Sequence, residues 1–110
     1  MMSWIYLIAA GVFEIGWPLG LKLGARPELR VWGPVIAVLC MTASGVLLWL
    51  ALKSIPLGTA YAVWTGVGAI GTFVVGVTVF GDASVLTRWL GIALIAGGVA
   101  MLKLAPGPSS

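Results

Sequence analysis

The chain consists mainly of long apolar runs that are separated by short polar or proline-containing segments. The runs do not alternate between apolar and polar positions, so they are typical of membrane-spanning helices and not of outer-membrane β-strands. Each run approaches the roughly 20 residues that a helix needs to cross a bilayer. The pattern predicts one all-α domain over residues 1–104, with transmembrane helices at about 3–23, 33–52, 57–80 and 85–104, followed by a disordered tail over 105–110.

Short connections separate the predicted helices. The first, over residues 22–30, is the only charge-dense stretch in the chain. Pro34 suits the first turn of the second helix, and Pro56 follows the end of that helix. Asp82 and Ser84 lie between the last two helices, where either side chain is a suitable N-cap for the fourth. We therefore expect Asp82 to be a solvated cap without a further role.

Composition draws attention to Glu14. The chain is 61% hydrophobic and only 8% charged, far from the balance of a soluble domain, and Glu14 is the only acid in the middle of a predicted span. An ionised side chain at that depth costs roughly 2.5–3.5 kcal/mol on insertion scales, and acids in membranes usually mark functional sites. A carboxyl group there can hold either a proton or a cation, as an exchanger requires. The alternative is a permanently protonated group that only hydrogen-bonds between helices.

The remaining composition excludes several other classes of chemistry. The chain has no histidine, one cysteine, Cys40, and no cluster of cysteines or carboxylates at the spacing of metal ligands. Its net charge of +3 is spread over loops and ends, without the basic face that nucleic acid requires. We therefore expect a protein that is not an enzyme and has no cofactor, metal site or nucleic-acid partner.

The fourth helix carries a candidate interface. Gly91 and Gly98 are seven residues apart and share one stripe, which fits either dimerisation or packing inside the monomer. Four helices of about 20 residues scarcely enclose a pathway that opens to both sides of a membrane, so the size predicts an oligomer. Basic residues near the spans number four on the side of loops 1 and 3 and two on the other side, a weak bias that allows both orientations in the membrane.

Several motifs resemble the small multidrug resistance family, over about residues 3–104. They are Glu14 with Trp17, the Leu21-Lys22 pair, the run Gly58-Thr-Ala-Tyr-Ala-Val-Trp-Thr-Gly66, and the spacing of Gly91 and Gly98. The position of Trp17 and the run over 58–66 resemble the guanidinium-exporter subtype more than the quaternary-ammonium exporters. The chain departs from the family pattern at Pro18, in its longer first loop and in its Pro-Gly-Pro tail.

The resemblance implies an antiparallel homodimer of four-helix subunits in the cell inner membrane, exporting guanidinium-type small cations in exchange for protons. Glu14 of both subunits would form the shared proton and substrate site. By position, Trp17, Ser44, Tyr61 and Trp64 would line the pocket, and the helix with Gly91 and Gly98 would form the dimer interface. The sequence leaves open whether a paralogous chain replaces the second copy.

The residue types fit this chemistry independently. Guanidinium offers paired N–H donors to a carboxylate, and the rings of Trp17, Tyr61 and Trp64 attract cations. The Ser44 hydroxyl could orient Glu14. Each residue alone also fits a structural role, because aromatic residues pack in cores and at interfaces, and a serine in a membrane helix usually bonds to the preceding turn.

The sequence also allows two functions other than guanidinium export. One is broad export of quaternary ammonium and other hydrophobic cations. The other is a non-transporting membrane subunit that assembles with a larger partner, whose basic residue would pair with Glu14. The two classes differ in whether the purified protein alone moves a cation against a proton gradient.

Overall fold

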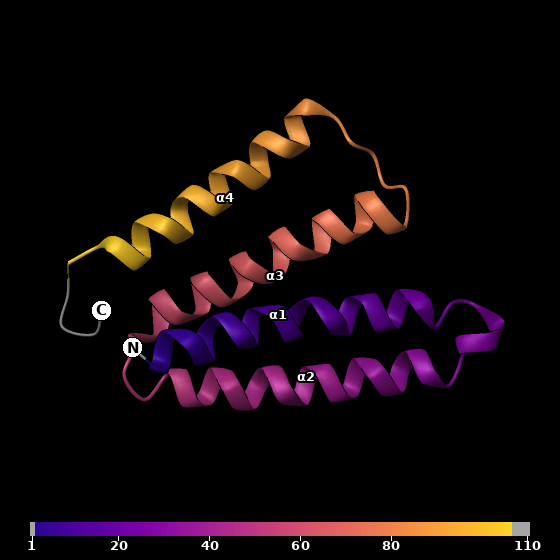
Figure 1. The fold of residues 1–110 in the computed structure, drawn as a ribbon, viewed down its shortest axis with the longest axis horizontal. Helices are drawn as coiled ribbons and strands as arrows, with labels where there is room; N and C mark the ends of the chain where they lie inside the picture. Colours follow the sequence, from indigo (N-terminus) through magenta and orange to yellow (C-terminus); the bar gives the residue numbers. More distant parts are fainter. Residues whose placement is uncertain (1, 107–110) are drawn as a thin grey trace.

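Residues 2–106, which this computed structural model describes, form four long helices (Figure 1). The helices are α1 (Met2–Leu23), α2 (Trp32–Ala51), α3 (Leu57–Val79) and α4 (Leu86–Leu104), and a short 3-10 helix, η1 (Pro27–Leu29), lies between α1 and α2. Each of the four is long and apolar enough to cross a membrane, and each end lies within one residue of the position expected from the apolar runs. Most of the tail for which we expected disorder, residues 107–110, lies outside the described part of the chain.

The helices form a flattened molecule with principal extents of 49 × 34 × 17 Å. Viewed down the shortest axis, α1 lies between α2 and α3, and α4 lies on the far side of α3 (Figure 1). Toward the connection between α3 and α4, both of these helices diverge from α1 (Figure 1). The packing of α3 and α4 against α1 is therefore closest at the end of the molecule that holds the N-terminus of α1.

That end holds the main hydrophobic cluster. Its buried members come from α1, from the end of α2 with the following turn, and from the start of α3: Trp4, Leu7, Ala51, Ile55, Ala60 and Val63. The Lys103 ammonium, near the end of α4, lies 4.8 Å from the centroid of the Trp4 ring, so a cation–π contact joins the last helix to the first.

Small residues let α1 and α2 approach closely at the opposite end. A Cβ atom added at Gly20 would lie 2.7 Å from the Gly33 carbonyl oxygen and 2.8 Å from the Ala37 nitrogen. These neighbours are backbone atoms, which cannot rotate away as a side chain does. Close backbone approach of this kind is a main source of helix association in membranes, where the hydrophobic effect does not drive helices together.

Helix α4 has no buried residue. Leu94, Met101 and Leu104 are between 73% and 82% exposed, and a Cβ atom added at Gly91 or Gly98 would meet nothing within 4 Å among the described residues. Packing inside the monomer therefore does not account for the glycine stripe. This face of α4 is available to lipid or to another protein chain.

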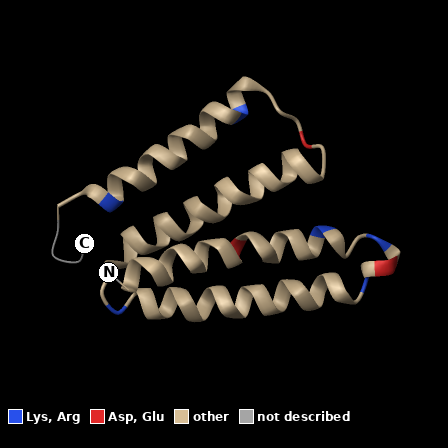
Figure 2. Ribbon diagram, in the orientation of Figure 1, with Lys and Arg blue, Asp and Glu red and all other residues tan. Residues whose placement is uncertain are grey.

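Charged residues gather at the two ends of the molecule, with the exception of Glu14 in the middle of α1 (Figure 2). The end with loops 1 and 3 carries four basic residues, Lys22, Arg26, Arg30 and Arg88. The opposite end carries Lys53 and Lys103. The distribution fits helices that cross a membrane with their ends in the two interfaces.

The close approach of α1 and α2 predicts the effect of one methyl group. Gly20→Ala is expected to lower the free energy of unfolding by about 1–3 kcal/mol, because the backbone of α2 has to move away. Gly45→Ala on α2 is the matched control, since a Cβ atom there meets nothing within 4 Å, and its effect should stay within about 1 kcal/mol. Unfolding of the purified protein by SDS, followed by circular dichroism, measures both, and equal effects would contradict this packing.

Candidate functional site

Glu14 lies half-buried on α1 and packs against α3. A Cβ atom added at Gly68, which is itself buried, would lie 2.6 Å from the Glu14 Cγ atom. Any larger residue at position 68 would therefore displace the glutamate side chain. The carboxyl group has no hydrogen bond or ion pair with another residue of the part of the chain that the structure describes, so it remains available to a proton or a ligand.

Pro18 lies inside α1, one turn after Glu14. Because proline has no N–H group, the Glu14 carbonyl lacks its usual helical donor. The helix nevertheless continues without a break from Met2 to Leu23. Membrane helices tolerate this defect where neighbouring helices support them, and α1 has such neighbours on two sides.

A hydrogen-bonded chain joins three helices one turn before Glu14. The Trp64 Nε1–H group on α3 donates to the Ser44 Oγ atom on α2 at 2.8 Å, and the Ser44 hydroxyl donates to the Ala10 carbonyl on α1 at 2.8 Å. Ser44 is only 1% exposed. Since a hydroxyl has one hydrogen, Ser44 cannot donate to Glu14 while it donates to Ala10.

Ser44 therefore differs from both sequence-based expectations. It does not bond within its own helix, whereas Thr42 does so by donating to the Val38 carbonyl at 2.9 Å. It also does not bond to Glu14 directly. Through its two hydrogen bonds, it fixes Ala10 relative to Trp64. Ala10 precedes Glu14 by four residues and lies on the same face of α1. Ser44 thus contacts the backbone of α1 one turn before Glu14 and not the carboxyl group itself.

The aromatic residues divide into two groups. The rings of Tyr61 and Trp64 lie 5.4 Å apart with an interplanar angle of 52°, Tyr61 being 56% exposed and Trp64 half-buried. Trp17 is half-buried on α1 and forms no aromatic pair within the described residues. The structure thus brings Glu14, Ser44 and Trp64 onto adjacent turns of three helices, with Tyr61 beside Trp64. Trp17 follows Glu14 by three residues on α1.

Sequence reasoning missed two members of this site, Gly68 and the Ala10 carbonyl. Gly68 follows Trp64 by four residues, so both lie on one face of α3. That spacing is a signal that places Gly68 opposite Glu14 once Trp64 is assigned to the site. No comparable signal identifies Ala10, because every residue has a carbonyl group.

The sequence matches the family model of the Small Multidrug Resistance protein over residues 2–95. The guanidinium exporter of Yersinia pseudotuberculosis is 45% identical over 104 residues, which cover 94% of this chain and 99% of that protein. The guanidinium exporter of Escherichia coli strain K12 is 44% identical over 104 residues, with 94% and 98% covered. That of Salmonella typhimurium is 40% identical over the same length, with 94% and 98% covered.

The hydrogen-bonded chain predicts how much stability the protein loses when the Ser44 hydroxyl is removed. Ser44→Ala leaves the Trp64 indole N–H without its acceptor and should lower the free energy of unfolding by about 1–3 kcal/mol. Thr42→Ala is the matched control, because the Thr42 hydroxyl bonds only within its own helix, and it should change the stability by less than about 0.5 kcal/mol.

The double variant Ser44→Ala/Trp64→Phe completes the test. It removes donor and acceptor together, so it should be less destabilised than the sum of the two single variants. SDS unfolding of the unmodified protein, Ser44→Ala, Trp64→Phe and the double variant measures this difference, and strictly additive effects would contradict a direct bond.

Proposed function

The chain belongs to the small multidrug resistance family, and on this basis we propose that it exports guanidinium-type cations in exchange for protons. It is a multi-pass protein of the cell membrane. The substrate class follows from relatives that are named guanidinium exporters and align with nearly the whole chain. Glu14 is the proposed shared site for proton and substrate.

The observation that carries the proposal is the position of Glu14. It is the only acid within the four membrane-spanning helices, it lies near the middle of α1, and no described residue pairs with its carboxyl group. An ion pair with a residue of the same chain would have supported a structural role. A carboxyl group that binds either a proton or a cation, but not both, couples the movement of one to the movement of the other.

The neighbouring side chains suit a small planar cation. The carboxylate accepts two parallel N–H bonds from a guanidinium group, and the Trp64 ring, with Tyr61 beside it, offers a cation–π surface. Ser44 holds Trp64 in place. Trp17, three residues after Glu14, belongs to the proposed pocket through its place on α1.

The functional unit that we propose is an antiparallel homodimer. One flattened chain leaves α4 without a buried residue, and the open Gly91 and Gly98 positions form a surface for a second copy. Two oppositely inserted copies would place two Glu14 side chains near one midplane site. An exchange of shape between the subunits would then turn an inward-open dimer into an equivalent outward-open one.

Transport measurements also distinguish two other functions from guanidinium export. Export of bulky quaternary ammonium ions would appear as faster transport of a tetraalkylammonium ion than of guanidinium. A non-transporting subunit would move neither ion when reconstituted alone. The names of the relatives favour guanidinium.

Removing the titratable proton of Glu14 is expected to abolish coupled transport. Glu14→Gln keeps the size of the side chain but cannot exchange a proton for a cation. Guanidinium uptake into liposomes driven by a proton gradient should fall to the level of protein-free liposomes. Glu28→Gln is the matched control, because this acid lies exposed in η1, and it should transport at near the rate of the unmodified protein. Similar rates for both variants would contradict the role of Glu14.

The antiparallel dimer predicts two orientations of one chain in the membrane. In a Cys40→Ala background, Arg26→Cys marks loop 1 and Ala105→Cys marks the opposite end. A membrane-impermeant maleimide added outside intact cells should label about half of each variant, and permeabilisation should release the other half. Complete labelling of one site with none of the other would show a single orientation and would rule out the antiparallel homodimer.

A further inference from the structure

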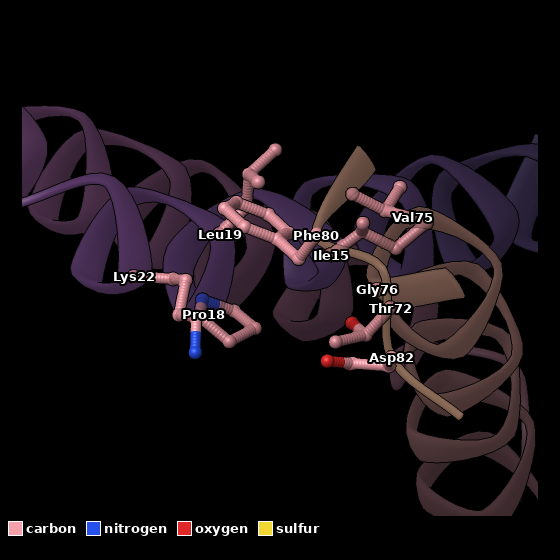
Figure 3. A pocket seen from close by; sticks show the side chains of 9 residues that line it. All are labelled: Ile15, Pro18, Leu19, Lys22, Thr72, Val75, Gly76, Phe80 and Asp82. Atoms are coloured by element: carbon pink, nitrogen blue, oxygen red, sulfur yellow. The ribbon is translucent and has the colours of Figure 1, made fainter. Parts of the chain in front are cut away.

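A cavity of about 180 Å³ lies between α1 and α3, at the end where α3 diverges from α1 (Figure 3). Its apolar wall includes Ile15 and Val75, and polar groups of Thr72, Lys22 and Asp82 also line it. Glu14 does not belong to this lining. The cavity is therefore distinct from the site described above.

The cavity is lined by the same faces of α1 and α3 that meet at Glu14. Pro18 and Lys22 follow Glu14 by four and eight residues on α1, and Thr72 and Gly76 follow Gly68 by the same steps on α3. Residues at these intervals share one face of a helix. Because Glu14 packs against Gly68, the two faces run side by side from Glu14 to the cavity, in the direction of loops 1 and 3.

The carboxyl group of Asp82 is turned back toward this cavity. The Asp82 backbone N–H donates to the Gly76 carbonyl at 3.0 Å, and Gly81, with a φ of 71°, makes the turn that a residue with a side chain rarely adopts. A Cβ atom at Gly76 would collide with the Asp82 carboxyl group. The expectation that Asp82 caps α4 is thus wrong, since the N-cap of α4 is Val85 and no side chain caps that helix.

The cavity also contains a surface that attracts cations. The Lys22 ammonium lies 5.9 Å from the centroid of the Phe80 ring, within the range of a cation–π contact. Figure 3 shows Lys22 and Asp82 on opposite sides of the cavity, and no ion pair joins them or any other charged groups within residues 2–106. The Asp82 carboxylate is therefore free of an ion pair with the described residues and available to an external cation. The Lys22 ammonium is a charge of the protein itself that already lies near the Phe80 ring.

We propose that this cavity is an outer binding site for a guanidinium-type cation, on the path between Glu14 and the membrane surface at loops 1 and 3. The Asp82 carboxylate accepts N–H bonds from the cation, the Thr72 hydroxyl offers a further acceptor, and the Phe80 ring covers one side. The Lys22 ammonium competes with the cation for the Phe80 ring and repels it by charge. Lys22 therefore lowers the affinity of the site, and the cation is released to the rest of the pathway. This inference rests on the proposed substrate class.

A binding experiment tests the site without transport. Methylguanidinium chloride is titrated into the detergent-solubilised Glu14→Gln protein, and the amide NMR signals of Thr72 and Gly76 are followed, with sodium chloride as the control. Saturable shifts with methylguanidinium alone are expected, and Asp82→Asn in the same background should abolish them. Equal shifts with sodium, or shifts that survive Asp82→Asn, would overturn the proposal.

Transport kinetics supply a second readout. In the protein with native Glu14, Asp82→Asn should raise the guanidinium concentration at half-maximal transport about two- to fivefold, the effect of one solvent-accessible ion pair. The change should appear in the half-maximal concentration and not in the maximal rate, and Lys22→Gln should lower the half-maximal concentration. Asp82→Glu, which keeps a carboxylate, should restore part of the affinity that Asp82→Asn loses.

An ion-pair gate gives a different pattern. If Asp82→Asn and Lys22→Gln lower the maximal rate equally, and Lys22→Asp/Asp82→Lys restores it, the two residues pair to close the pathway and the binding site is refuted. If the unmodified protein transports no guanidinium, the proposed export function fails, whereas the methylguanidinium titration still decides whether Asp82 binds this cation.

Discussion

The close contact of α1 with both of its neighbours governs the rest of this structure. On one side, Gly20 lets the backbone of α1 approach that of α2, and on the other side Gly68 lets Glu14 lie against α3. Ser44 then joins all three helices through two hydrogen bonds. Since apolar burial gives little preference for one helix contact over another in lipid, these few contacts fix where the carboxyl group lies.

The same arrangement leaves much of the molecule uncovered. With α1 between α2 and α3, the last helix contacts mainly α3 and has no buried residue. A polar pathway cannot face lipid without a large energetic penalty, and this is the physical reason for which we propose that a second chain encloses the site. The open glycine stripe of α4 supports the same proposal, because it leaves a surface on which a second copy can pack.

Sequence patterns predicted the four helices closely because the thickness of a bilayer fixes the length of an apolar run. They also drew attention to Glu14 as a candidate, since a single acid in an apolar span stands out without any knowledge of its surroundings. They did not predict the partner of Ser44, because a hydroxyl bonds within its helix or across to another according to the packing. The turn of Asp82 toward α3 depends likewise on Gly76 and Gly81 acting together in space.

The most direct test of the central claim is transport by the purified chain alone. The protein is reconstituted into liposomes with an acidic interior, and uptake of labelled guanidinium from a neutral exterior is measured before and after an ionophore collapses the proton gradient. Proton-coupled exchange predicts accumulation above the external concentration that disappears with the gradient. The absence of guanidinium uptake, or uptake that is the same without a gradient, would contradict it.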